Sequence, residues 1–525
     1  MEISKFQISV IIALLAVSFL LNLGISPLYF EEPRRALVAM EMVMSGNYVT
    51  PTIMGEYYYN KPPMFNWLIA AGYKLTGGYS EWISRLVSVF SFWIMALINY
   101  LFVAKNFNKK LALWSSLFLL ISGNIYFYFS TLGEIDLFYA MISFGSIASI
   151  IHGYWQNKNA YLFAVSYLLA AVGFLTKGFP SPIFVGATFV VLAAVNKDWR
   201  LLLNYRHLLG LAIFIALVGS YFLLYNHYND ANIFLDKILS QSSDRTADKG
   251  SFKIFINHFS TFPIDTIKDV LPATAFSLLL LLKPVRRAFF SNKKLILLLL
   301  VFLLNYAVYW ISPGTRARYI YMLYPLLIIP LISCFQIFVA GNFKLKVYLQ
   351  KGLASLAILA AIALGIVSFV IPESNNFIIA ISIILGLSLL MLGVVFWQKM
   401  NHQLILMLLI VVVFRIWFNV VVLPVRANEG PRADDKALAM QWVELINDKK
   451  MYLLYPKYPG VFPLESAYYF QKEANQILHV KPIDCENYFL ANDNELNKIK
   501  KGEVETVHTF SWRNIPYKIV KLNCN

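Results

Sequence analysis

The stretch FQISVIIALLAVSFLLNLGISPLYFEEPRR, residues 6–35, decides the fold of this chain. Its first part, Phe6 to Leu28, has no charged residue and exceeds the roughly 20 residues that a helix needs to cross a hydrocarbon core of about 30 Å. No small-residue cleavage site follows it, so we expect a retained span rather than a cleaved signal peptide. Four charged residues follow this span at the membrane interface: Glu31, Glu32, Arg34 and Arg35.

The composition places most of the chain in lipid. Of its 525 residues, 58% are hydrophobic and 14% are charged, whereas a soluble domain has about 25% charged residues. Apolar runs of span length recur along most of the sequence, which excludes an ordinary soluble enzyme. The formal net charge of +16 is compatible with nucleic-acid binding. In a membrane protein, however, Lys and Arg gather in cytoplasmic loops, and we expect no nucleic-acid partner.

About thirteen apolar runs are predicted to be transmembrane helices. They begin near Ile8, Trp82, Leu111, Ile135, Tyr161, Pro182, Leu208, Ile267, Leu295, Tyr319, Leu353, Phe377 and Leu404. With Met1 in the cytoplasm, the even-numbered connections carry the clusters of Lys and Arg, and KPVRRAFFSNKK at 283–294 is the densest. The positive-inside rule therefore places these connections in the cytoplasm and the C-terminal tail outside.

Two domains are predicted from this pattern. Residues 1–424 form an all-α polytopic membrane domain with extracytoplasmic loops at 30–80 and 226–266, and residues 425–525 form a small α/β or α+β extracytoplasmic domain. The second domain shows no catalytic motif, and we expect a structural or acceptor-docking role. Its two cysteines, Cys485 and Cys524, can pair in an oxidising compartment.

Charged residues also occur on the face that the positive-inside rule depletes. TLGEIDLF places Glu134 and Asp136 at the mouth of the fourth span, where acidic residues also favour a helix dipole. FLTKGFPSP places Lys177 on that face, and ISPGTRARY adds Arg316 and Arg318. Cations of this kind bind phosphate by charge-assisted hydrogen bonds, although snorkelling toward lipid headgroups is the alternative. The set favours an anionic ligand.

Five segments, in this order, resemble the landmarks of the GT-C glycosyltransferases. They are FEEPRRALVAMEMVMSGNYVTPTIMGEYYYNKPPMFNWL (30–68), SRLVS (84–88), GEIDLF (133–138), FLTKG (174–178) and SPGTRARYIYMLYP (312–325). Within that superfamily the chain is similar to the bacterial aminoarabinose lipid A transferases and, more distantly, to the protein O-mannosyltransferases. The resemblance covers roughly the first 340 residues, and each segment alone is weak.

The resemblance implies an enzyme of GT-C fold in the bacterial cytoplasmic (inner) membrane, with its active site on the periplasmic side. It would move a sugar from a polyprenyl-phosphate donor to an envelope lipid, glycan or protein, with inversion. The alternative is a transporter or flippase of lipid-linked sugars, which would show charged or broken mid-membrane segments and repeated halves. Arg415 alone lies inside an apolar run, where helix packing or interface anchoring would explain it.

Catalytic roles are carried over to the matching residues. Glu31 is the expected general base, although the family more often has Asp there, and Glu32 is the alternative. Asp136 matches the acidic residue of the family's second landmark. Arg34 would orient the carboxylates or contact the donor phosphate. The expected phosphate clamp consists of Lys177, Arg245, Arg316 and Arg318, of which Arg245 rests on loop analogy and is as readily a solvated loop charge.

The remaining expected contacts involve substrate. Tyr58 and Tyr59 would stack on sugar rings, although interfacial aromatics also anchor proteins in membranes. Lys61 lies in a loop stiffened by two prolines, and Glu134 would support the base, bind the acceptor or position the sugar. Asn60 stands where the family pattern has Glu before Lys-Pro-Pro, which removes a potential ligand. We therefore predict no metal site and no cofactor beyond the lipid-linked donor.

Overall fold

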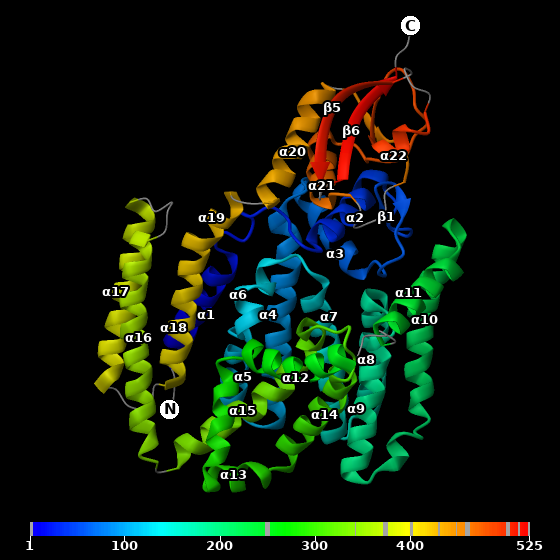
Figure 1. The fold of residues 1–525 in the computed structure, drawn as a ribbon. Helices are drawn as coiled ribbons and strands as arrows, with labels where there is room; N and C mark the ends of the chain where they lie inside the picture. Colours follow the sequence, from blue (N-terminus) through cyan, green and yellow to red (C-terminus); the bar gives the residue numbers. More distant parts are fainter. Residues whose placement is uncertain are drawn as a thin grey trace.

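A computed structural model of the chain shows a mostly helical protein (Figure 1). It describes residues 4–246, 252–341, 343–370, 376–398, 403–428, 431–447, 449–456, 462–499, 504–512 and 515–522. The long helices run roughly side by side, and the segments that follow α19 (Leu423–Asn428) lie at one end of them with the helices of the first loop. This end contains Glu31 and its neighbours.

Nine helical segments of the described residues are long and apolar enough to cross a membrane. They contain α4 (Glu81–Asn106), α7 (Ile135–Trp155), α8 (Asn159–Lys177), η2 with α10 (Trp199–Leu201, Arg206–Tyr228), α14 (Lys293–Trp310), η4 with α15 (Ala317–Leu323, Tyr324–Ala340), α16 (Leu345–Val370), α17 (Asn376–Gln398) and α18 (Gln403–Trp417) with the π-helix η5 (Phe418–Val422). A bent pair raises the number to ten: α5 (Lys109–Leu120) and α6 with η1 (Gly123–Phe127, Phe129–Thr131) meet at 50°. The chain is a polytopic membrane protein, but with fewer long spans than the sequence predicted.

Besides this bent pair, three of the predicted spans differ from long continuous helices. α1 (Lys5–Leu20) and α9 (Pro180–Asn196) are apolar but shorter than a full span. The run near Ile267 is interrupted, because α12 (Phe252–Asp269) ends there and the 3₁₀ helix η3 (Ala273–Leu281) and α13 (Lys283–Phe290) follow. Pro272 and Pro284 lack the amide hydrogens that a continuous helix would use. The prediction of one span from Ile267 onward rested on hydropathy alone and was therefore wrong.

The loop predicted at 30–80 is folded. It contains α2 (Glu32–Ser45), the antiparallel pair of β1 (Thr52–Ile53) and β2 (Glu56–Tyr57), and α3 (Met64–Thr76). Pro33 stands in the first turn of α2, where its missing amide hydrogen costs nothing, and Gly46 ends the helix with φ of +72°. The second loop folds into α11 (Ala231–Thr246) and α12. Both loops therefore present side chains from regular elements.

The C-terminal region combines helices with a four-stranded sheet. The sheet order is β3-β4-β6-β5, with β3 parallel to β4 and the other neighbours antiparallel. Its elements are α20 (Pro431–Ile446), β3 (Met451–Leu453), α21 (Leu464–Ala474), β4 (Tyr488–Asn492), α22 (Asp493–Leu496), β5 (Val504–Trp512) and β6 (Ile515–Leu522). Trp442 packs on Phe510 at the centre of this region. Cys485 is disulfide-bonded, and Cys524 lies outside the described residues.

Helix α21 joins the C-terminal region to the first loop. The Tyr469 hydroxyl accepts a hydrogen bond from the Leu28 amide at 2.9 Å. Gln471 Nε2 donates to the buried carboxylate of Glu41 in α2 at 3.1 Å. Because Leu28 is three residues before Glu31, these bonds hold the chain that leads to the charged segment.

Arg415 lies in the interior of the helix bundle and is fully buried. Its Nε donates to the Ser18 carbonyl of α1 at 3.3 Å, and its Nη2 donates to Ser130 Oγ of η1 at 3.3 Å. These contacts join three segments far apart in the sequence, so Arg415 packs helices and does not anchor the protein at the interface.

Candidate active site

Glu31 stands at the start of α2 with its side chain partly accessible. The preceding residue, Phe30, has φ of +68°, a conformation that side chains other than glycine rarely adopt. Such a backbone persists where surrounding contacts hold it. The Glu31 carboxylate pairs with Arg34 and lies 3.9 Å from Arg35 Nη2, and 29% of its side chain is exposed. A carboxylate with this exposure can receive a proton from an incoming molecule.

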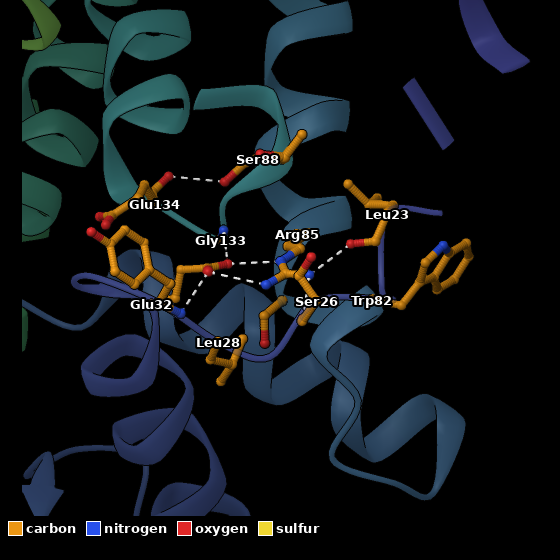
Figure 2. A network of polar contacts seen from close by, with 12 residues as sticks. Leu23, Ser26, Leu28, Glu32, Trp82, Arg85, Ser88, Gly133 and Glu134 are labelled. Carbon is orange, nitrogen blue, oxygen red and sulfur yellow. Dashed lines mark hydrogen bonds and ion pairs between the residues drawn. The ribbon is translucent and has the colours of Figure 1, made fainter. Parts of the chain in front are cut away.

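Glu32 is fully buried, in contrast to Glu31. Arg85 of α4 binds it with two hydrogen bonds, from Nε at 2.9 Å and from Nη2 at 3.1 Å. The Gly133 amide donates to Glu32 Oε1 at 2.6 Å, and the Tyr29 amide donates to Oε2 at 3.0 Å. Figure 2 shows both carboxylate oxygens of Glu32 engaged by this network. Glu32 has no oxygen left for a substrate proton without losing one of these bonds.

Arg85 also binds the chain that precedes Glu31. Its Nη1 donates to the carbonyls of Leu23 at 2.8 Å and Ser26 at 2.9 Å, and its Nη2 donates to the Pro27 carbonyl at 3.1 Å (Figure 2). A buried arginine of α4 therefore fixes the exit of the first helix, α1, relative to α4.

Glu134, directly before α7, contacts Glu31 and stands two positions before Asp136 in the sequence. Its side chain is buried, and its Oε1 accepts the Glu31 amide hydrogen at 3.2 Å. Ser88 Oγ donates to the Glu134 carbonyl at 2.9 Å. Burial raises the pKa of the Glu134 carboxyl to about 8, and the negative charge of Asp136 adds to the rise. The raised pKa favours the protonated form of Glu134 beside the Glu31 backbone.

Asp136 and Lys177 form a buried ion pair between α7 and α8. Lys177 Nζ lies 2.5 Å from Asp136 Oδ1, and the two side chains are 9% and 3% exposed. The ammonium also lies over the rings of Tyr139, at 4.9 Å, and Tyr319, at 5.2 Å from the centroids. Aromatic faces stabilise a cation that has lost water. Charge is thus retained deep in the protein at this point.

Arg318 approaches the same pair from η4. Its Nε lies 3.9 Å from Asp136 Oδ2, and its guanidinium packs 4.7 Å from the Phe30 ring centroid. Arg318 Nε and Nη1 are buried and, among the described residues, have no hydrogen-bond partner. Buried donors are normally satisfied, so these two point to an acceptor that the protein itself does not supply. The exposed Arg316 lies farther out, 5.8 Å from the Phe30 ring.

A cavity of about 140 Å³ adjoins the Asp136–Lys177 pair. Lys61, Lys177 and Asn60 supply polar groups to its wall, and aromatic side chains are the largest group among the other lining residues. These aromatic residues are Tyr139, Phe179, Phe184, Tyr309 and Tyr319. A few polar groups within an apolar wall are typical of small-molecule sites.

The structure brings together most of the residues selected from the sequence. Glu31, Glu134, Asp136, Lys177 and Arg318 meet through the contacts described above, and Arg34 is paired with Glu31. Lys61 is buried in the cavity wall. The side chain of Arg245 lies outside the described part of the structure.

The two tyrosines are held by protein contacts. Tyr58 is buried, and its hydroxyl accepts from Arg35 Nη1 at 2.6 Å. The Tyr59 hydroxyl accepts from Asn229 Nδ2 at 2.9 Å, and its ring packs on Phe234 of α11. Neither tyrosine is among the described residues that line the cavity.

The sequence did not single out Arg85 or the cavity aromatics as site residues. Arg85 was visible as a charge near the start of an apolar run, and intramembrane charges are rare enough to indicate a buried partner. Tyr139 and Tyr319 carry no such signal, since aromatic residues are frequent throughout this chain. Within the part of the chain that the structure describes, no group of three or more His, Cys, Asp or Glu residues is placed to hold a metal ion.

Comparisons with known proteins support the resemblance seen in the sequence. Residues 60–223 match the family model described as dolichyl-phosphate-mannose-protein mannosyltransferase. The chain is 29% identical over 202 residues to the undecaprenyl phosphate-alpha-4-amino-4-deoxy-L-arabinose arabinosyl transferase of Shewanella sediminis, and the match covers 36% of each chain. A relative of the same kind from Pseudomonas fluorescens is 25% identical over 225 residues, 41% of this chain and 39% of that one. The matches thus span little more than a third of these curated relatives.

Solved structures extend the likeness to the whole fold. ArnT from Cupriavidus metallidurans bound to undecaprenyl phosphate has a TM-score of 0.71 to this chain at 16% sequence identity, with 98% of both chains covered. The apo form of the same protein has a TM-score of 0.69 at 14% identity. At these identities the comparison concerns the fold, and the chain has an ArnT-like fold. The resemblance predicted from the residues is confirmed.

Proposed function

We propose that this chain is an integral membrane glycosyltransferase that uses a polyprenyl-phosphate-linked sugar. The observation that carries the proposal is the unsatisfied Arg318 beside the buried Asp136–Lys177 pair, next to a partly exposed carboxylate. The names of the relatives, which include an undecaprenyl phosphate sugar as donor, support the same chemistry. None of the relatives reported above is named as a transporter, so the alternative of a flippase for lipid-linked sugars has no support from them.

The cations would hold the donor phosphate. Arg318 Nη1 is buried and makes no hydrogen bond to the described residues, Arg318 Nε lies 3.9 Å from Asp136 Oδ2, and Lys177 lines the cavity. A guanidinium binds phosphate oxygens through paired hydrogen bonds. As the bond between the sugar and the phosphate breaks, negative charge grows on the leaving oxygen, and these cations would stabilise it. Arg316, at the exposed edge, would act on the donor as it enters, and Lys61, which lines the cavity with Lys177, would also contact it.

Glu31 would act as the general base. In a single displacement, the acceptor hydroxyl oxygen forms its bond to the anomeric carbon while the carbon–oxygen bond to phosphate breaks, and the electron pair leaves with polyprenyl phosphate. The hydroxyl proton passes to the Glu31 carboxylate. One carboxylate suffices for this inverting route, because no covalent sugar–enzyme intermediate forms. Arg34, paired with Glu31, would hold the carboxylate in position.

The other two acidic groups would have supporting roles. Glu32, held by Arg85 and the Gly133 amide, would fix the loop that carries Glu31 rather than accept a proton. Glu134, which retains its own proton near neutrality, would avoid placing a third negative charge beside Glu31 and Asp136. We infer that its protonated carboxyl can donate a hydrogen bond to the sugar or the acceptor.

The site is proposed to face the periplasm of a bacterial inner membrane. The basic helix α13, with Arg286 and Arg287 exposed, lies at the opposite end of the helices from the C-terminal region (Figure 1). The positive-inside rule makes that end cytoplasmic. The disulfide of Cys485 supports an oxidising compartment for the other end. The acceptor would be an envelope lipid, glycan or protein, and the C-terminal region would brace the site or receive the acceptor.

The proposal is tested by giving purified protein in detergent a polyprenyl-phosphate sugar together with candidate envelope acceptors. Expected products are glycosylated acceptor and free polyprenyl phosphate in equal amounts, detected by mass spectrometry. Glu31→Gln should lower the rate of formation of both by about 10²- to 10⁴-fold, while Glu56→Gln, which changes an exposed carboxylate in β2 of the same loop, should lower neither. Translocation of the lipid-linked sugar in reconstituted vesicles without any transfer would overturn the proposal.

A further inference from the structure

A second hollow shares no lining residue with the cavity beside Lys177. Helices α1, α4 and α5 enclose a groove of about 880 Å³ that is lined mainly by apolar side chains. Lys109 and Lys110, at the first turn of α5, stand at one end of it. The other end of α4 begins at Glu81, which pairs with Lys472 of the C-terminal region at 3.6 Å. The two lysines therefore lie at the membrane face opposite to the candidate active site.

The groove is open to lipid along its length. Ile12 of α1 and Leu97 of α4 contribute to its wall and are 55% and 54% exposed. The wall follows α5 from Lys109 to Leu120, which at 1.5 Å per residue is roughly 17 Å. One leaflet of a bilayer has about 15 Å of hydrocarbon, half of the core thickness. A groove of this length matches one lipid chain that hangs from a headgroup at the lysines.

The charged end of the groove suits an anion. Both lysines are exposed, and neither has an ion-pair partner among the residues that the structure describes. They also stand at the positive end of the α5 helix dipole. Basic clusters at this depth attract anionic lipid headgroups by about 1 kcal/mol per residue, or about fivefold in affinity.

We propose that this groove binds one anionic phospholipid of the cytoplasmic leaflet. Its phosphate contacts Lys109 and Lys110, and one acyl chain lies along α5 between Trp93 and Trp114, which both line the groove. This lipid groove includes neither the donor cavity nor Glu31, so the lipid proposal is tested independently of the proposed glycosyl transfer.

Native mass spectrometry of the detergent-purified chain tests the headgroup contact. Phosphatidylglycerol should bind more tightly than phosphatidylcholine of the same acyl chains, and Lys109→Gln with Lys110→Gln should weaken phosphatidylglycerol binding by about 25-fold. Arg286→Gln with Arg287→Gln removes two exposed cations from α13, outside the groove, and should leave this binding unchanged. Equal losses in both double variants, equal binding of the two lipids, or preferred binding of a polyprenyl phosphate would overturn the proposal.

Fluorescence quenching tests the position of the acyl chain. Phosphatidylglycerol with brominated chains should quench the protein, and Trp114→Phe should remove part of that quenching. Trp199→Phe, which changes an exposed tryptophan of η2 outside the groove, should not remove the part that depends on Lys109 and Lys110. Ala16→Phe, which fills the groove wall, should block binding and leave the lipid-free melting temperature unchanged. Quenching that is unaffected by Trp114→Phe would contradict a lipid in this groove.

Discussion

Two consecutive residues, Glu31 and Glu32, have opposite environments. Glu32 is completely buried and accepts hydrogen bonds from Arg85, Gly133 and Tyr29. Glu31 is 29% exposed and is paired with Arg34 at the edge of the site. They stand at the first turn of one helix, so a rotation of about 100° between neighbouring residues sends one side chain into the protein and leaves the other partly exposed.

The comparison shows how one short motif can supply both a buried, fully bonded carboxylate and a partly exposed one. A buried ion pair with every lone pair satisfied fixes geometry but is closed to substrate. The carboxylate beside it gains a fixed backbone without losing access.

Removing the carboxylate of Glu32 should destabilise the loop that carries Glu31. Glu32→Gln leaves the buried Arg85 without its counter-charge, and we expect the free energy of unfolding to fall by about 3–5 kcal/mol. Denaturation in mixed micelles, followed by circular dichroism, measures this change. Glu56→Gln, on the exposed strand β2, serves as the control and should not change stability. Wild-type stability in Glu32→Gln would show that the network does not brace the loop.

Removing a clamp cation should weaken donor binding more than acceptor binding. Arg318→Ala deletes two unsatisfied buried donors, and a hydrogen bond to a charged group contributes about 1.5–3 kcal/mol, so donor affinity should fall roughly 10- to 150-fold. Lys177→Ala should behave similarly, and the exposed Arg316→Ala should have a smaller effect. Binding isotherms with a polyprenyl-phosphate sugar measure the change, and Arg200→Ala on the opposite membrane face is the control. Equal effects on donor and acceptor would refute the clamp.

The buried Glu134 should make stability depend on pH. Its pKa is raised in the folded protein to about 8, so the folded state binds more protons than the unfolded state between the ordinary carboxyl pKa and that value. The stabilisation is complete below the ordinary pKa and is lost as pH rises through about 8, by up to about 1.4 kcal/mol per pH unit. Melting temperatures between pH 5 and pH 9 should fall more steeply for the wild type than for Glu134→Gln. Parallel curves would contradict the raised pKa.

The bond from α21 should have the smallest effect. Tyr469→Phe removes the acceptor for the Leu28 amide and should cost about 1 kcal/mol of stability. It should also lower the transfer rate modestly, because Leu28 leads to Glu31. Tyr488→Phe, in β4 of the same region, is the matched control for stability and activity. A larger loss of activity from Tyr488→Phe would place the influence of the C-terminal region elsewhere.

The sequence could predict the membrane class and most of the residues that the structure brings together at the candidate site, for a physical reason. Lys177 and Arg318 are conspicuous because cations are scarce on the face that carries them, and Asp136 follows a turn at the start of an apolar run. The division between Glu31 and Glu32 could not be predicted, because it depends on Arg85, which lies 53 positions from Glu32 in the sequence. Long-range partners of this kind leave no local pattern.

The number of spans shows a related limit. Hydropathy measures the apolar content of a segment but not the continuity of its helix. It therefore could not predict the 50° bend between α5 and α6 or the helix break after Asp269. Short apolar helices such as α9 have the composition of a span without its length. The predicted fold was nevertheless correct, because the resemblance rested on the order of the five landmark segments and not on the number of spans.

The most direct test of the account is to measure kcat and donor affinity together for Glu31→Gln. Loss of a general base lowers rates by about 10²- to 10⁴-fold, and Arg318 and Lys177 remain in place to hold the phosphate. We therefore expect a loss of kcat in this range, with donor affinity within about twofold of the wild type and an unchanged melting temperature. Near-normal kcat in Glu31→Gln, with the same losses appearing in a folded Glu32→Gln, would contradict it.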